Sequence, residues 1–481
     1  MKQRNQSRHW WRLVAIAGCA FALSGCAQFS PDGGMSLVGA TVQQELGKDV
    51  LAIRSQDEAD SARELVRSLL RRPLSADHAV QVALLNNRGL QAAFSDLALA
   101  EAEKVGDSLP PNPSISLSRI SGPLEIEIER RIVADVVGLA TLPFRSELAA
   151  ERFRRAQLRA ILETVRTAAD TRRAYYRAVA GTELVGYLAQ AQQATDSMTQ
   201  FAKRLGETGA MNKLDQTREL AFFAELTAQL ASARQRATSD REALIRRMGL
   251  WGSDLDFKLP SSLPPLPARA RTLANIEVEA IRRRIDLQMG RIELAALAKS
   301  YRLTQATRFI SFLDAGYADK ILKDKVSGER SRERGFELEL EIPIFDFGEV
   351  RVREAEARYM AAVNRLLELA VNIRSEARDA YRTYRSSYDI ASHYTREVLP
   401  LRKIITDEAQ LRYNGMLIDV FGLLTESRQR IVATTAAIDA KRDFWLAATN
   451  LGTAVLGGGS AEAAGASGPQ MSSAASAAAA H

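Results

Sequence analysis

Two short stretches that alternate apolar residues with glutamate constrain this 481-residue chain more than any other feature. Residues 124–129 read LEIEIE, and residues 336–342 read FELELEI. Because successive side chains of a β-strand point to opposite faces, each stretch gives one apolar face and one row of three carboxylates. The predicted carboxylate rows are Glu125, Glu127 and Glu129 in the first stretch and Glu337, Glu339 and Glu341 in the second.

Each stretch has a neighbour that also alternates, so the sequence predicts two strand pairs. The first pair lies at about 112–132, with a short turn at Ser121-Gly122-Pro123. The second pair lies at about 307–345, and its charged middle segment, residues 318–333, is predicted to be an exposed loop.

Long helices account for most of the remaining chain. No proline occurs between residues 344 and 399, and apolar residues between Ala355 and Ile373 recur at alternating spacings of four and three. This spacing is typical of coiled-coil packing. The sequence predicts one helix from Glu349 to about Arg412 and a return helix to about Val455. In the first half, the long helical pattern resumes at about Ser146.

The same order of patterns occurs twice with a period near 200 residues, which predicts a duplicated structural unit. The predicted fold class is mainly α, with strand pairs and long antiparallel coiled-coil helices in both copies. The predicted segments are a lipoprotein signal peptide (1–25), an N-terminal lipidated segment (26–72), a first repeat (73–259), a proline-rich linker (260–270), a second repeat (271–456) and a disordered Ala/Gly/Ser tail (457–481).

The N-terminus carries a secretory signal. Four basic residues precede the apolar run 13–26, which ends in Leu23-Ser24-Gly25-Cys26. This ending resembles the bacterial lipoprotein processing box, which implies cleavage before Cys26 and acylation of Cys26, for example by palmitate. The alternative is an ordinary cleaved signal with an incidental cysteine. Removing residues 1–25 lowers the net charge from +7 to about +3, which weakens any case for nucleic-acid binding.

Four strands of this length suit a membrane but cannot close a barrel, and open strand edges are not tolerated in lipid. Three copies of the chain would give twelve strands, with the apolar faces toward lipid and the glutamates lining a wet lumen. Eighteen carboxylates around one pore would favour cations. The alternative is a soluble sheet with one face on a core and the other in water.

Four segments, taken in order, resemble the TolC-like outer membrane efflux family. They match the family's opening helix, inter-repeat segment, strand-to-helix corner and helix-tip segment. The segments are PLSADHAVQVALLNNRGLQAA (73–93), ALIRRMGLWGSDLDFKLPSSLPPLP (243–267), FELELEIPIFDFGEVRVREAEARYMAA (336–362) and RYNGMLIDVFGLLTESRQR (412–430).

The resemblance implies a homotrimer with a twelve-stranded outer membrane β-barrel above a periplasmic helical tunnel. It also implies an exit duct of a tripartite efflux system, with a periplasmic adaptor protein and an inner membrane pump as partners. The implied location is the outer membrane, where the protein would contact the membrane lipid and be held by a lipid anchor, and from which it would extend into the periplasm. The alternative function is a structural coiled-coil lipoprotein that spans the periplasm without a pore.

The same resemblance places the periplasmic tips of the helices at the breaks near Gly209 and Gly415. Asp215 and Asp419 fall where the family often has carboxylates at the tunnel's constriction. The alternative is that both aspartates are helix N-caps. No arginine lies within residues 416–420, which disfavours a salt-bridged latch of the family's best-known type.

Catalysis, metal binding and cofactor binding have little support in the sequence. After the signal, the histidines are His78, His393 and His481, which are far apart and make no paired ligand spacing. Cys26 is the only cysteine of the mature chain, so a cysteine-based metal site is excluded. We therefore predict that the protein is not an enzyme and carries no metal or cofactor.

Overall fold

The computed structural model describes residues 28–209, 211–310 and 312–457. The predicted signal peptide, the predicted lipidation site Cys26 and residues 458–481 of the predicted tail lie outside the described residues. The described chain divides into two units, one formed by residues 94–160 and 286–369 with the N-terminal residues up to Val38, and the other formed by the remaining residues.

The order of elements repeats, as the sequence patterns predict. The first series is α4 (Ala76–Asn86), α5 (Arg88–Ser108), β1 (Ser114–Ser121), β2 (Glu125–Asp135), α6 (Val136–Glu207) and α7 (Lys213–Met248). The second series is α8 (Ile276–Arg283), α9 (Ile285–Ala306), β3 (Phe312–Asp324), β4 (Arg330–Glu341), α10 (Glu349–His393), η3 (Tyr394–Val398), α11 (Leu399–Asn414) and α12 (Val420–Leu456). Two further helices, α2 (Met35–Leu46) and α3 (Gln56–Leu70), precede both series, and a short 3₁₀ helix, η2 (Gly252–Leu255), follows α7.

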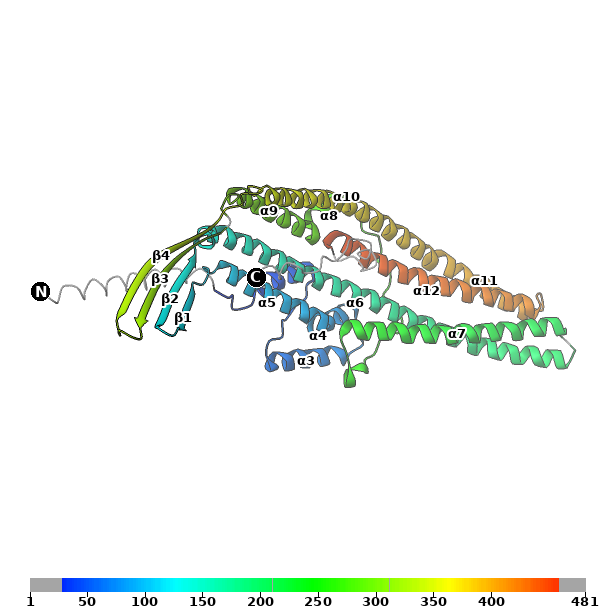
Figure 1. Cartoon of the computed structure of the whole chain (residues 1–481). Coiled ribbons are helices and arrows are strands. Elements are labelled where there is room, and N and C mark those ends of the chain that lie inside the picture. Colours follow the sequence, from blue (N-terminus) through cyan, green and yellow to red (C-terminus); the bar gives the residue numbers. More distant parts are fainter. Residues whose placement is uncertain (1–27, 210, 311, 458–481) are drawn as a thin grey trace. The chain divides into compact units, whose positions relative to one another are not determined.

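The four strands form one antiparallel sheet in the order β1-β2-β3-β4, side by side in the first unit (Figure 1). β3 and β4 pair continuously from Phe312 with Glu341 to Lys323 with Arg330. The predicted exposed loop at 318–333 is therefore wrong, because most of it continues the two strands. Only residues 325–329 form the turn, and the charges of the segment do not prevent pairing, since their side chains leave the plane of the sheet.

The junction between the first strand pair and its long helix also differs from the prediction. β2 runs to Asp135 and α6 begins at Val136, ten residues before the predicted start at Ser146. The Asp135 carboxylate accepts a hydrogen bond from the Gly138 backbone N–H at 2.7 Å, which caps the new helix. Further along the same unit, Lys299 of α9 pairs with Glu147 of α6 at 2.6 Å.

The second unit contains two antiparallel helix hairpins, in which α7 returns along α6 and α12 returns along α11 (Figure 1). Leu188 of α6 packs against Leu226 and Leu230 of α7 in one buried cluster. Near the other end of α12, Trp445 stacks on Tyr176 with ring centroids 5.2 Å apart. Apolar packing of facing helices, rather than any single polar contact, therefore stabilises this unit.

The predicted helix from Glu349 to about Arg412 is confirmed, with one local change. α10 passes through a π-helical turn, η3, before α11 continues to Asn414. Pro400 is the second residue of α11, two positions after the end of this turn, and it lacks the N–H that a regular helix needs, so the ladder of hydrogen bonds must be interrupted here. Within the described residues, no helix combines the length and the apolar character needed to cross a membrane.

Candidate functional site

The sheet separates charge between its two faces. Residues paired across neighbouring antiparallel strands point to the same side, so the register assigns every side chain to a face. One face, called the acidic face below, carries all six predicted glutamates. Its acidic residues are Glu125, Glu127, Glu129, Asp135, Asp314, Asp324, Glu333, Glu337, Glu339 and Glu341. Only two basic residues, Arg131 and Lys320, share this face.

The two basic residues neutralise part of the acidic face. Lys320 pairs with Glu127 at 2.6 Å, and Arg131 pairs with Glu129 at 3.0 Å and with Glu337 at 3.3 Å. Arg131 reaches Glu337 across β3, where the opposing residues Ala318 and Gly316 are small. Among the described residues, the remaining predicted glutamates form no ion pair, so the face keeps a large negative excess. These unpaired glutamates are Glu125, Glu339 and Glu341.

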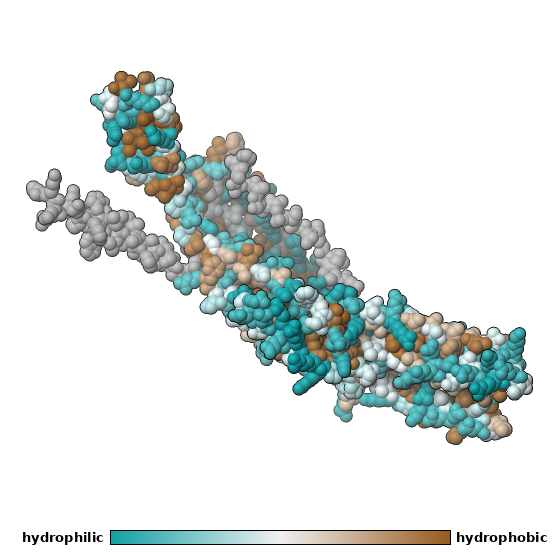
Figure 2. All heavy atoms as spheres, turned by 90° about the horizontal axis from the view of Figure 1, so that it is seen from below, coloured by the Kyte–Doolittle hydropathy of each residue, from teal (hydrophilic) through white to brown (hydrophobic). Residues whose placement is uncertain are grey.

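The opposite face is apolar over the half of the sheet nearest the helices. Phe336 and Leu338 of β4 are 91% and 70% exposed in the single chain, and Ile115 of β1 is 76% exposed. In the space-filling view, apolar and polar side chains both lie on the visible surface of the sheet (Figure 2). A face with this much exposed apolar area needs either another protein surface or lipid to cover it.

Five charged residues of the acidic face were not predicted from the sequence: Asp135, Asp314, Lys320, Asp324 and Glu333. Lys320, Asp324 and Glu333 fall in the segment that was predicted to be a loop, so their alternation with the predicted glutamates was not followed. Glu333, Glu337 and Glu339 are separated by even numbers of residues along β4, as expected for one face of a strand. This spacing is the signal that could have predicted Glu333.

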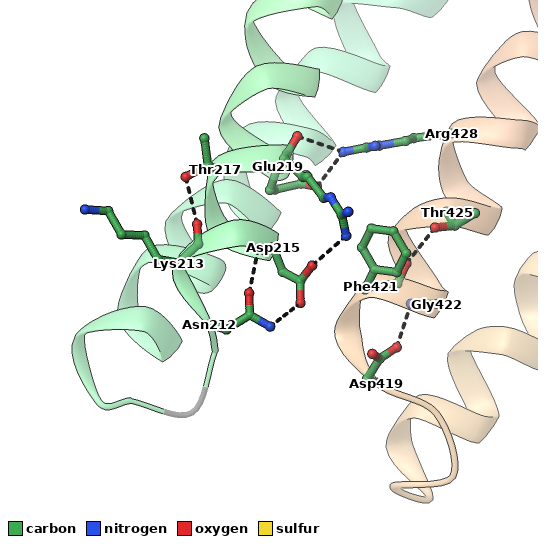
Figure 3. Close-up of polar contacts among 11 residues, drawn as sticks. Asn212, Lys213, Asp215, Thr217, Glu219, Asp419, Phe421, Gly422, Thr425 and Arg428 are labelled. Atoms are coloured by element: carbon green, nitrogen blue, oxygen red, sulfur yellow. Dashed lines mark hydrogen bonds and ion pairs between the residues drawn. The ribbon is translucent and has the colours of Figure 1, made fainter.

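The first helix tip lies between α6 and α7. Gly209 has φ +74, a left-handed conformation that favours glycine and ends the outgoing helix. Asn212 is the N-cap of α7, because its side-chain oxygen accepts a hydrogen bond from the Asp215 N–H at 2.8 Å (Figure 3). Asp215 itself lies in the first turn and pairs with Arg218 at 3.1 Å. The alternative that Asp215 is an N-cap is therefore wrong.

The second tip uses different residues for the same tasks. Gly415 has φ −81, and the left-handed residue is its neighbour Met416, with φ +56. Asp419 is the N-cap of α12, and its carboxylate accepts a hydrogen bond from the Gly422 N–H at 2.8 Å (Figure 3). The N-cap alternative is thus confirmed for Asp419. Met416 and Leu417 are 93% and 77% exposed at this tip.

One buried contact joins the two hairpins close to their tips. Arg428 of α12 donates to the Glu219 carboxylate of α7 at 3.2 Å and to the Arg218 carbonyl at 3.1 Å (Figure 3). Its guanidinium also lies over the Phe222 ring, 4.2 Å from the centroid. We call Glu219, Phe222 and Arg428 the tip clamp. The clamp was not predictable from the sequence, because Glu219 and Arg428 are separated by 209 residues.

The clamp carboxylate has an unfavourable environment. Glu219 is 1% exposed, and its Oε1 atom has no hydrogen-bond partner among the described residues. Burial raises the pKa of Glu219, and the charge of Arg428 and its hydrogen bond offset only part of that shift. Burial of the Glu219 carboxylate near the tip therefore lowers the stability of the fold. In the part of the chain that the structure describes, no group of three or more potential metal ligands was found.

Comparisons with known proteins agree with this arrangement. Residues 278–414 match the family model described as outer membrane efflux protein. The chain is similar in structure to the Campylobacter jejuni CmeC outer membrane channel, with a TM-score of 0.65 at 15% identity over 85% of this chain and 89% of that one. It is similar to the outer-membrane channel OprN, with a TM-score of 0.64 at 18% identity over 90% and 97% of the two chains.

A third similar structure is the open state of the Neisseria gonorrhoeae MtrE outer membrane channel, with a TM-score of 0.62 at 14% identity over 79% of this chain and 88% of that one. No curated protein matches the sequence. At these identities, the structural likeness shows that the chain has the fold of outer membrane channels.

Proposed function

We propose that this chain, which carries an outer membrane efflux protein domain and has the fold of outer membrane channels, is the exit duct of an efflux system. The observation that carries the proposal is the two-faced sheet. One face has an excess of carboxylates, and the other has exposed apolar side chains. Both edge strands, β1 and β4, lack an outer neighbour among the described residues of the single chain.

The open edges support a homotrimer. An unpaired strand edge in lipid leaves backbone groups unsatisfied, so a membrane sheet of four strands needs further strands. Pairing β4 of one subunit with β1 of the next would use both edges, and three subunits would close a barrel of twelve strands. The acidic faces would then line the lumen, and the apolar faces would meet the lipid.

The helix tips support a protein partner. Leu214 at the first tip and Met416 and Leu417 at the second are large, exposed and apolar. Adjacent exposed apolar residues such as Met416 and Leu417 form a small patch that a protein partner could cover. In the proposed assembly, a periplasmic adaptor protein docks there and connects the duct to an inner membrane pump. Gly209, Asp215, Gly415 and Asp419 would lie at the periplasmic entrance.

Lipidation of Cys26 completes the proposal and would anchor the protein in the outer membrane. The duct itself needs no catalytic residue, since the pump supplies the energy. The wild-type protein should be labelled by radioactive palmitate, and the Cys26→Ser variant should not. If Cys26 is not lipidated, neither the wild type nor the variant will be labelled.

Planar bilayer recording of the purified protein tests the duct directly. We expect heat-resistant trimers on gels and discrete channels whose reversal potential in a salt gradient shows cation preference. Replacing Glu125, Glu339 and Glu341 by glutamine should weaken that preference, because these glutamates form no close ion pair among the described residues. A monomer that forms no channel would refute the duct and favour a periplasm-spanning tether.

A further inference from the structure

The face of the sheet opposite the acidic face changes from apolar to basic partway along the strands. Nearest the helices, its rows are apolar, for example Leu338 and Phe336 of β4. From there to the hairpin turns, six basic residues and a single acid lie on the same face, interleaved with the apolar residues Leu117, Ile126, Ile128 and Ile321. We call the six basic residues the cationic band: Arg119, Arg130, Lys323, Arg330, Arg332 and Arg334. The acid is Asp319.

The border between the two parts carries an aromatic pair. Tyr317 and Phe336 face each other in the register, with ring centroids 5.6 Å apart in an edge-to-face arrangement. The next row contains Arg130, Asp319 and Arg334. Two residues along a strand span about 6.7 Å, so the basic residues begin one side-chain row beyond the aromatic pair. Aromatic residues mark membrane–water interfaces, which places the band at headgroup level.

We propose that the cationic band binds the phosphate groups of an anionic lipid in the outer leaflet of the membrane. The proposal rests on the proposed function, because that function turns the acidic face inward and this face toward lipid. Arginine suits such a ligand, since its guanidinium donates two parallel hydrogen bonds to phosphate oxygens. Five of the six band residues are arginines.

Asp319 has a positioning role in this surface. Arg332 donates to its carboxylate through Nε and Nη2, both at 2.6 Å, and Arg334 lies 3.7 Å from it. Asp319 is 6% exposed, whereas the Arg332 and Arg334 side chains are 49% and 55% exposed. The buried carboxylate therefore holds Arg332 over the strands while leaving guanidinium donors accessible from outside.

The remaining members of the band form no close ion pair. Among the described residues, Arg119, Lys323 and Arg330 are exposed and have no acidic partner, and Arg130, also exposed, interacts with Asp319 only at longer range. An uncompensated row of like charges costs energy unless an opposite charge lies near it. Phosphate groups at the membrane surface supply that charge, whereas zwitterionic headgroups carry no net charge.

The test uses the purified full-length protein and lipopolysaccharide as the probe, because it is a lipid whose phosphates can be removed enzymatically. We expect the protein to bind intact lipopolysaccharide about tenfold more tightly than the dephosphorylated form. Changing Arg119, Lys323 and Arg330 to glutamine together should weaken binding of the intact form about tenfold, and raising the salt from 0.1 to 0.5 M should weaken it further. These three residues were chosen because they have no protein partner to lose.

A matched control removes three charges elsewhere. Arg236, Arg365 and Lys403 are exposed helix residues without ion pairs among the described residues, and their joint change to glutamine should alter binding less than twofold. Equal binding of intact and dephosphorylated lipid would overturn the proposal, because the acyl chains would then explain the contact. An equal loss of lipid binding in the control variant would overturn the proposal as well. The proposal would also be overturned if millimolar inorganic phosphate competed with the lipid and bound as tightly as the lipid does.

Channel recording separates this proposal from the duct. The Arg119, Lys323 and Arg330 variant should keep the wild-type conductance, because these residues do not share the acidic face. Absence of any channel in the wild type would refute the proposed function. Normal channels with no phosphate-dependent lipid binding would refute the cationic band alone.

Discussion

The two helix tips perform the same turn with different chemistry. In the first tip, Asn212 caps α7 and leaves Asp215 in the first turn beside Arg218. In the second tip, Asp419 is itself the cap of α12, and Met416 takes the left-handed conformation. Two aspartates that look equivalent in sequence therefore have separate roles, one as a helix cap and the other as a charged surface group.

The two tips depend on each other through the tip clamp. The first hairpin contributes the buried carboxylate Glu219, and the second contributes the guanidinium of Arg428. Neither tip has the complete clamp. A change in either hairpin should therefore alter both, whereas a change in a cap should alter only its own helix.

The largest effect is expected from Arg428→Ala. This change leaves the Glu219 carboxylate, whose side chain is 2% exposed, without its cation, and also removes the contact with Phe222. Breaking one side of a buried ion pair costs about 3 kcal/mol. Hydrogen exchange measured by mass spectrometry should show faster exchange in both α7 and α12 near the tips.

Arg402→Ala is the control for that change. Arg402 pairs with Glu426 at 3.4 Å, but both side chains are about one-third exposed and both belong to the second hairpin. Its removal should cost at most about 1 kcal/mol and leave α7 unaffected. Equal effects of the two variants would contradict the role of the clamp.

Glu219→Gln should have a smaller effect and remove a pH dependence. Because burial raises the folded-state pKa of Glu219 above its ordinary value of 4.5, the neutral form is favoured in the folded state. The resulting stabilisation is complete below the unfolded-state pKa and is lost as the pH rises through the folded-state pKa. Exchange near the clamp, corrected for intrinsic rates, should therefore slow on acidification in the wild type. The glutamine variant should lack this Glu219-dependent slope.

The sequence predicted the duplicated elements because their signals are local. Alternation over eight residues and heptad spacing over long proline-free segments need no knowledge of distant contacts. The prediction was wrong at residues 318–333. The charges of this segment were taken as evidence for a loop, although every second side chain still points to the same face of the sheet. The prediction was also wrong at Ser146, because the capping of α6 by Asp135 at Gly138 was not recognised.

The candidate site was predicted unevenly for the same reason. The six glutamates share one face, as their spacing indicates, since strand geometry alone decides it. The clamp between Glu219 and Arg428 could not be found, because nothing in either segment reveals which helix packs against it. The distinction between Asp215 and Asp419 depends on a difference of a few residues in where each helix begins.

Asp419→Ala sharpens the comparison between the caps. Loss of the hydrogen bond to the Gly422 N–H should destabilise the start of α12 by about 1 kcal/mol, while Asp419→Asn should retain most of that stability. Faster exchange should be confined to the first turns of α12. If Asp419 acts only as a cap, single-channel conductance should remain unchanged, and a changed conductance with normal exchange would assign it to the pore instead.

Asp215→Asn is expected to have the smallest effect on stability, and it therefore tests the comparison most directly. The N-cap Asn212 remains in place, and the Oδ1 atom of an asparagine at 215 can still accept the hydrogen bond that Asn212 Nδ2 donates to Asp215. The change then removes only the ion pair with Arg218, whose side chain is half-exposed, so the cost should be about 0.5 kcal/mol or less. Exchange in α7 should stay close to that of the wild type. Asn212→Ala, by contrast, should destabilise the same turn by about 1 kcal/mol, because it removes the cap itself. If Asp215→Asn proved as costly as Asn212→Ala, the two tips would share one capping mechanism, and the separate roles of the two aspartates would be wrong.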